Sequence, residues 1–186
     1  MDGSRPNNRL TVAEYLAWAE GAPAGRYELV NGEVIEKAPE RARHNLLKLD
    51  AVLALRNAIA RSGIEAIAYT DGMTVVIDER TTREPDALVQ VKPIDLDSLI
   101  ADEPLIVVEV TSPSSERDDI STKLTEYFSV PSIQHYIVVD ATKSLVIHHC
   151  RQDADQILTR IIREGDIVLD PPGMTVPFAE MMPKFE

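Results

Sequence analysis

Apolar residues recur with helical or strand-like periods along most of the chain, and two helices stand out first. Residues 11–20 predict a short helix, because Thr11 suits the N-cap position, Glu14 completes a capping box and Gly21 follows the end. Residues 43–63 predict the longest helix. Its apolar residues recur near the helical period at Leu46, Leu49, Leu53 and Ile59.

Alternating or continuous apolar runs predict the strands. Residues 27–30 and 33–36 predict a hairpin, because the Asn31-Gly32 pair between them favours the tight turn that joins two strands. The remaining predicted strands and strand pairs lie within 64–78, 84–91, 134–149 and 156–170, before a proline-rich tail.

The middle of the chain predicts the fold class. Residues 105–110 (LIVVEV) and 136–140 (YIVVD) are nearly continuous β-branched runs, as expected for strands that are covered on both faces. The amphipathic segment 115–130 between them suits a right-handed crossover helix. We therefore expect an α/β fold in one domain over 1–186, with a mixed sheet flanked by helices, antiparallel hairpins at its margin and a flexible tail over 1–10.

Composition and charge limit the class of protein, its cellular compartment and its possible partners. The chain is 44% hydrophobic, contains no apolar run of the roughly 20 residues that span a bilayer, and begins with a polar stretch unlike a secretory signal. The one cysteine, Cys150, excludes an internal disulfide and a metal site built on cysteines, and it fits a cytoplasmic protein. The net charge of −12 repels nucleic acid at long range, so contact with DNA would need a bound cation or a local group of basic residues.

Glu109 does not fit the buried strand in which it lies, because burying an unpaired carboxylate costs several kcal/mol. Asp86 follows Pro85 at the start of another predicted strand, and Lys123 lies on the helix that follows Glu109. Two carboxylates on adjacent strands can share Mg²⁺ or Mn²⁺, which prefer oxygen ligands, and a nearby lysine can stabilise negative charge on a phosphate. The pattern predicts a metal site at Asp86 and Glu109 with Lys123 beside it.

Other polar residues are weaker candidates for the same site. Glu28 and Glu33 lie in the predicted hairpin, and Glu28 is favoured because it stands between apolar neighbours. His44 opens the long helix. The four histidines predict no metal cluster, since the adjacent His148 and His149 point to opposite faces of a strand.

The same residues carry a resemblance to a bacterial family of predicted endonucleases in the PD-(D/E)XK nuclease superfamily. It extends from about residue 15 to the C-terminus, and its matching segments are RYELVNGEVIE, EPDALV, IVVEVTSPSSERDDISTKLTEY and VPSIQHYIVVD. The resemblance implies a restriction-endonuclease-like fold and metal-dependent cleavage of DNA. It makes Asp86 and Glu109 the metal ligands, with Lys123 and Glu28 as further catalytic residues.

The chain departs from the family pattern at two places. Thr111 stands where the superfamily usually has its lysine, two residues after the second acid, and in the narrower family the matching lysine lies on the following helix, at Lys123. Residues 134–140 (QHYIVVD) replace the Glu-Tyr-Trp run that often precedes the last core strand. Each candidate also has an ordinary structural interpretation. Asp86 would then begin a strand, Glu109 would pair with a basic residue, and Lys123 would pair with Asp119 on the helix surface.

The preferred function is therefore a Mg²⁺-dependent endonuclease that hydrolyses DNA phosphodiester bonds. One alternative is a catalytically inactive binding or regulatory protein on the same fold, which the acidic charge and Thr111 favour. Another is a small-molecule phosphodiesterase. The endonuclease function needs Asp86, Glu109 and Lys123 within one pocket, together with a basic rim whose candidates are Arg41, Arg43, Lys48 and Arg117.

A homodimer is the expected assembly, because two sites related by a two-fold axis would most simply cut both strands of a duplex. The apolar predicted hairpins at 145–150 and 166–178 are the candidate contacts between the two copies.

Overall fold

The structure, a computed structural model, describes residues 6, 8–91, 95–111 and 117–182, and over 117–120 the backbone alone. Most of the predicted tail at 1–10 lies outside the described residues, but Leu10 is buried and its N–H donates to Gly32 O at 2.8 Å. The elements in chain order are α1 (Val12–Ala19), β1 (Tyr27–Val30), β2 (Glu33–Glu36), α2 (Ala42–Ser62), β3 (Ala66–Thr70), β4 (Val75–Asp78), β5 (Thr81–Arg83), β6 (Ala87–Val91), β7 (Pro104–Thr111), α3 (Arg117–Ser129), β8 (His135–Asp140), β9 (Leu145–Arg151), β10 (Ile157–Ile162), β11 (Asp166–Leu169), β12 (Met174–Pro177) and α4 (Phe178–Met181).

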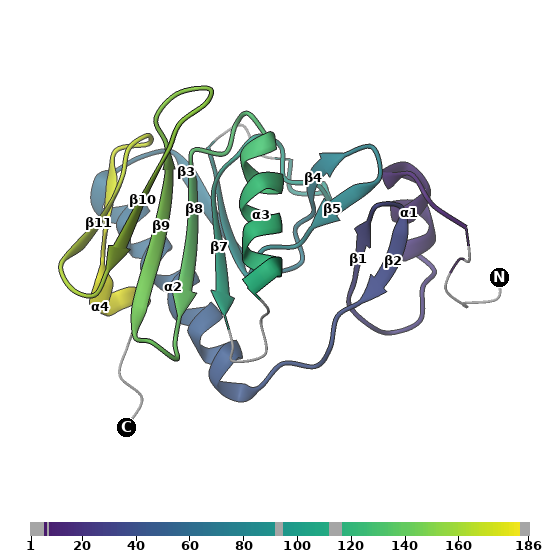
Figure 1. Ribbon diagram of the computed structural model, residues 1–186, viewed down its shortest axis with the longest axis horizontal. Helices are drawn as coiled ribbons and strands as arrows, with labels where there is room; N and C mark the ends of the chain where they lie inside the picture. Colours follow the sequence, from purple (N-terminus) through teal and green to yellow (C-terminus); the bar gives the residue numbers. More distant parts are fainter. Residues whose placement is uncertain (1–5, 7, 92–94, 112–116, 183–186) are drawn as a thin grey trace.

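A six-stranded mixed sheet forms the centre of the molecule, in the order β10-β9-β8-β7-β6-β3 (Figure 1). Strands β7 and β8 are parallel, and the other neighbours in this sheet are antiparallel. Helix α3 joins the parallel pair. Shorter antiparallel pairs, β1-β2, β4-β5 and β11-β12, lie outside the sheet. The predicted α/β fold, with a mixed sheet flanked by helices and added hairpins, is confirmed.

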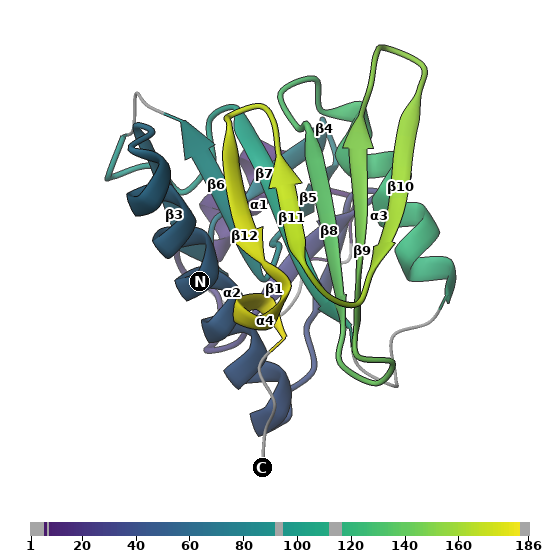
Figure 2. The same ribbon diagram turned by 90° about the vertical axis from the view of Figure 1, so that its left-hand side faces the viewer.

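Helices cover both faces of the sheet (Figure 1). On one face, apolar residues of α2 such as Leu55 pack on β-sheet residues such as Val108, together with the β11-β12 hairpin and α4, which Figure 2 brings to the front. On the other face, Tyr127 of α3 packs with Val107. Consecutive residues of β7 therefore belong to different cores, which explains its continuous apolar sequence.

The first helix and the first hairpin follow their local sequence signals. The Thr11 side chain accepts a hydrogen bond from Glu14 N–H, and the Glu14 carboxylate accepts one from Thr11 N–H at 2.8 Å, so the predicted capping box is confirmed. Asn31 and Gly32 have φ values of 51° and 83°, the left-handed conformation that the predicted two-residue turn requires.

The buried face of α2 differs from the prediction. Leu46, Leu49 and Leu53 are each about half exposed, at 47%, 53% and 47%. The helix buries another stripe, formed by Leu47, Ala51, Ala54, Leu55 and Ala58. The alanines on this stripe let the helix backbone lie close to the sheet, whereas periodicity alone favoured the stripe with the larger side chains.

The C-terminal strands pair differently from the prediction. The sequence of residues 156–170 suggests two strands that pair as a hairpin, but this hairpin does not form, because β10 pairs with β9 and β11 pairs with β12. The segments expected to contact a second copy are largely covered, since β9 lies inside the sheet and residues such as Ile167 and Val176 are fully buried. Their sequence suggested exposure only because the pairing was not known. The homodimer and the single domain stay predictions.

None of the helices in the described ranges is long and apolar enough to cross a membrane.

We expect the two stripes of α2 to respond differently to truncation. Leu55→Ala should lower the free energy of unfolding by about 2–5 kcal/mol, because it leaves a cavity under the sheet. The matched variant Leu53→Ala should change it by less than about 0.5 kcal/mol, because that side chain is half exposed. Urea unfolding of both variants measures the difference, and equal losses would contradict the orientation of α2.

Candidate active site

Glu109 lies near the carboxyl end of β7, and its side chain is held by two residues of α3. Its Oε1 accepts a hydrogen bond from the Tyr127 hydroxyl at 2.6 Å, and its Oε2 lies 3.0 Å from Lys123 Nζ. Lys123 and Tyr127 are four residues apart, so they lie on the same face of the helix. The carboxylate is only 8% exposed, and these contacts explain how a buried strand tolerates it.

The charge on Glu109 is disfavoured despite these partners. Burial raises the pKa of Glu109 above its ordinary value of 4.5, the positive charge of Lys123 opposes the rise, and the negative charge of Asp86 adds to it. Glu109 and Asp86 therefore interact as two like charges, and a cation between them would relieve the repulsion.

Asp86 is fixed at the beginning of β6, beside the end of β7. The register pairs Ala87 with Val108, and the Val110 N–H donates to Asp86 Oδ2 at 2.8 Å. Burial would raise the pKa of Asp86, but hydrogen bonds from His44 and Val110 N–H and the charge of Lys48 hold it below its ordinary value. Asp86 thus stays ionised and receives contacts from both β7 and α2.

Glu28 reaches the same region from the N-terminal hairpin. It is buried and accepts from Lys37 Nζ at 3.1 Å, from Glu84 N–H at 3.0 Å and from Arg83 Nη1 at 3.3 Å. Burial would raise the pKa of Glu28, but the charges of Lys37 and Lys123 outweigh it and lower the pKa. The structure therefore brings all four predicted residues into one electrostatic network: Glu28, Asp86, Glu109 and Lys123.

The sequence suggested that Lys48 belongs to a basic rim, but the structure places it inside this network. Its side chain is 3% exposed, and Nζ lies 2.6 Å from Asp71 Oδ2, 2.8 Å from Glu40 Oε2 and 3.4 Å from Asp86 Oδ1. Arg26 pairs with the same two acids, Glu40 and Asp71. The sequence contained one signal for this placement of Lys48. Lys48 follows His44 by one helical turn, so both side chains face the Asp86 side of α2.

Of the other residues considered from the sequence, some join the site and some do not. Glu33 is exposed and lies 3.9 Å from Arg9, so it does not join the network. Thr111 donates its hydroxyl proton to Val139 O at 3.4 Å. His44 Nε2 lies 3.6 Å from Asp86 Oδ2, so the structure adds it to the site. The side chains of Arg117 and Asp119 lie outside the described residues, and Lys123 pairs with Glu109.

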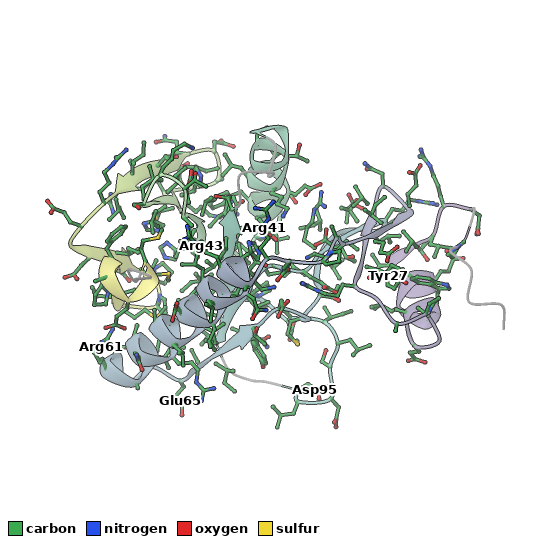
Figure 3. The ribbon with its side chains drawn as sticks, turned by 90° about the horizontal axis from the view of Figure 1, so that it is seen from below. Tyr27, Arg41, Arg43, Arg61, Glu65 and Asp95 are labelled. Atoms are coloured by element: carbon green, nitrogen blue, oxygen red, sulfur yellow. The ribbon has the colours of Figure 1, made fainter. Side chains whose placement is uncertain are left out.

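A pocket of about 230 Å³ opens next to His44, between the beginning of α2 and the ends of β7 and β8. Figure 3 shows Arg41 and Arg43 at this end of α2, far from Arg61 at the other end. Both arginines are exposed, so they supply positive charge at a pocket whose wall includes His44, the residue that contacts Asp86. The pocket is lined by Arg41, Arg43, His44, Leu47, Thr111, Ala141 and Thr142.

Two sets of side chains could hold a divalent cation. Asp86 and Glu109 offer carboxylate oxygens, the ligands that Mg²⁺ and Mn²⁺ prefer. Glu40, His44 and Asp86 also place ligand atoms within 4.8 Å of one another. Glu40 already pairs with Lys48 and Arg26, so a cation there would compete with two side-chain charges. Glu109 is likewise engaged, by Tyr127 and Lys123, and Asp86 is common to both sets, so Asp86 is the residue on which either cation site depends.

Comparison with known proteins agrees with this architecture. The profile of the Uma2 family, described as "Putative restriction endonuclease", matches residues 12–178. Two uncharacterised proteins of Synechocystis sp. are similar: slr1290 is 26% identical over 157 residues, which cover 83% of this chain and 82% of that protein, and sll1609 is 28% identical over 160 residues, which cover 84% and 89%.

A solved structure shows the same fold. The crystal structure of a "putative nuclease" from Anabaena variabilis superposes with a TM-score of 0.68 at 16% identity, and the match covers 92% of this chain and 97% of that chain. The fold and the family that the sequence predicted are confirmed. The chain belongs to the Uma2 family, within the restriction-endonuclease-like proteins.

Proposed function

We propose that this protein is a metal-dependent endonuclease that hydrolyses phosphodiester bonds of DNA. The observation that supports this most is the 3.0 Å contact between Lys123 Nζ and Glu109 Oε2. It brings a lysine from α3 to the acid of β7, while Asp86 is fixed at the neighbouring strand end. Membership of the Uma2 family, described as "Putative restriction endonuclease", supports a nuclease-like function independently of this contact.

Asp86 and Glu109 would hold Mg²⁺ or Mn²⁺. The fit rests on their oxygen ligands and on the raised pKa of Glu109, which reflects burial together with the nearby charge of Asp86. When bound, such a cation polarises a phosphate oxygen and lowers the pKa of a coordinated water.

The side chains of the chain have separate roles in this proposal. Lys123 orients the attacking water and stabilises negative charge that builds on the phosphate. Tyr127 holds the Glu109 carboxylate in one orientation, and the Val110 N–H does the same for Asp86. Glu28 assists from a greater distance, through its electrostatic interaction with Lys123.

Arg41 and Arg43 offer a way for an acidic chain to accept DNA. They are exposed at the pocket beside His44, where they would contact backbone phosphates of a bound strand. Such contacts act locally, so they are compatible with a net charge of −12 over the whole molecule.

The net charge also favours the second candidate function, a catalytically inactive binding or regulatory protein on the same fold. The two functions differ in one measurement. An active enzyme nicks supercoiled plasmid in Mg²⁺ or Mn²⁺ above a chelated control, and the inactive protein does not.

Lys123→Ala should reduce metal-dependent plasmid nicking by at least about 100-fold, because it removes one electrostatic stabiliser of the transition state. Arg61→Ala is the matched control, since it removes a positive charge from an exposed ion pair with Glu180 at the far end of α2. Circular dichroism should first verify that both variants are folded. Cleavage by Lys123→Ala at the wild-type rate would remove Lys123 from the mechanism.

Metal binding should appear as thermal stabilisation. A cation that binds only the folded chain at 100 times its Kd adds about 2.7 kcal/mol, so Mg²⁺ or Mn²⁺ should raise the Tm of the wild type. Asp86→Asn and Glu109→Gln should lose most of this rise, whereas Glu33→Gln should keep it, because Glu33 lies outside the site. An equal rise in all four proteins would place the cation elsewhere.

The pH dependence of stability should separate Glu28 from Glu109. The pKa of Glu28 is lowered, so its contribution to stability is present above its ordinary pKa of 4.5 and is lost as the pH falls through the lowered pKa. The pKa of Glu109 is raised, so its contribution is present below 4.5 and is lost as the pH rises through the raised pKa.

At neutral pH, Glu28→Gln should therefore lower the free energy of unfolding and Glu109→Gln should raise it, and both differences should shrink in acid. Urea unfolding of the metal-free proteins across this pH range is the measurement. A change of the same sign in both variants would contradict the charge distribution described for the site.

A further inference from the structure

A second group of metal-ligating side chains lies away from the acidic site. His135 on β8 is directly opposite Cys150 on β9, and His148 is two residues before Cys150 on the same face. Ligand atoms of these three side chains all lie within 4.8 Å of one another. The adjacent histidines at 148 and 149 do point to opposite faces as expected, but the pairing of β8 with β9 supplies His135, which the sequence did not connect with them.

The position of this group separates it from Glu109. Along the parallel β7-β8 pair, His135 is aligned with Ile106 and Glu109 with Val138, three residues further on, which is roughly 10 Å along the strand. His135 shares the face of Ile137, which packs under α2, whereas Glu109 faces α3. The two groups therefore lie on opposite faces of the sheet.

Hydrogen bonding orients His135 as a ligand. Its Nε2 lies 2.7 Å from Pro171 O, and because a carbonyl can only accept, Nε2 carries the proton. In the neutral ring, Nδ1 then accepts a hydrogen bond from His148 Nε2–H at 2.9 Å, and a metal bound at Nδ1 would replace this hydrogen bond. A histidine whose second nitrogen donates to a backbone carbonyl is the usual arrangement around a protein-bound metal.

The pair of histidines is buried and incompletely satisfied. His135 and His148 are 0% and 1% exposed, and His148 Nδ1 has no hydrogen-bond partner among the described residues. Buried polar atoms without a partner call for a specific explanation, and a bound ion is one.

We propose that His135, His148 and Cys150 form a binding site for Zn²⁺ or a similar transition-metal cation. Two imidazoles and a thiolate are the ligands that Zn²⁺ favours, whereas Mg²⁺ favours the carboxylates of the other site. In a tetrahedral Zn²⁺ site, Zn–N distances of about 2.0–2.1 Å and a Zn–S distance of about 2.3 Å place ligand atoms roughly 3.3–3.6 Å apart. The three ligand atoms lie within 4.8 Å of one another, and His135 Nδ1 and His148 Nε2 are 2.9 Å apart, so the arrangement is close to this spacing.

Such an ion would connect three parts of the chain. Strand β8 contributes His135, strand β9 contributes His148 and Cys150, and the β11-β12 loop is attached through Pro171 O. Cys150 is partly exposed, so metal can enter from its side and water can complete the coordination. The site stabilises this end of the sheet and takes no part in the proposed cleavage reaction.

Cobalt binding tests the site without any measurement of activity. The metal-free full-length chain, kept reduced, is titrated with Co²⁺ and followed by near-ultraviolet absorption. A thiolate-to-cobalt charge-transfer band should grow and saturate at one equivalent, and Zn²⁺ should remove it by displacement. The band requires a sulfur ligand, so Co²⁺ bound at Asp86 and Glu109 would not produce it.

Four variants make the assignment specific. Cys150→Ser should abolish the band. His148→Gln should lower the Co²⁺ affinity at least about tenfold, which is in the range seen when metal-site partners are lost. His149→Gln is the matched control and should keep the band, because His149 faces the other side of β9 and hydrogen-bonds Thr159 Oγ1 at 2.8 Å. Glu109→Gln should also keep it, which separates this site from the proposed catalytic one.

Thermal stability gives a second readout. Zn²⁺ should raise the Tm of the wild type and of His149→Gln but not of Cys150→Ser, while the response to Mg²⁺ should be the same in all three. Absence of the charge-transfer band in the wild type, or its persistence in Cys150→Ser, would overturn the proposal and leave the two histidines as a hydrogen-bonded pair.

Discussion

The buried carboxylate of Glu109 is the constraint around which the site is arranged. An ionised carboxylate in a strand covered on both faces needs partners that reach it from outside the strand. The helix that follows supplies them, Lys123 and Tyr127, four residues apart on one face. This contact fixes α3 against the carboxyl end of β7, and α3 in turn delivers the chain to the start of the parallel strand β8.

The same principle extends through the neighbouring charges. Each buried acid near the site has a basic partner, as Glu28 has Arg83 and Glu40 has Lys48. Removing one member of either of these two pairs would leave the other charge without its partner. This acidic protein therefore has basic side chains such as Lys48 and Arg83 in its interior, while Arg41 and Arg43 are exposed at the pocket.

Local sequence signals predicted much of the fold. The capping box of α1, the Asn31-Gly32 turn and the β-branched runs of β7 and β8 each depend on residues close together in the chain. Features set by distant contacts were harder to predict. Which stripe of α2 is buried depends on the sheet it meets, and the burial of Lys48 depends on Asp71, 23 residues away.

In the site, too, features set by residues close in the chain were predicted, and features set by distant contacts were not. Asp86, Glu109 and Lys123 follow from motif order along the chain, and the structure brings them together with Glu28. The pairing of His135 with His148 depends on the β8-β9 register, which the sequence of neither strand specifies alone. The contact of His44 with Asp86 likewise depends on how α2 is placed against β6.

The N-terminal unit of α1, β1 and β2 has its own small core, formed by Leu10, Tyr15, Leu29 and Val34. It lies beside the β4-β5 pair (Figure 1), which it meets through hydrogen bonds such as Gly32 N–H to Arg80 O. It reaches the site through Glu28, which pairs with Arg83. A unit with a separate core and polar attachments can open locally while the central sheet stays folded. Each such opening would separate Glu28 from Arg83 and expose these two charges to solvent, so the hydration of this part of the acidic network depends on how firmly the hairpin is attached.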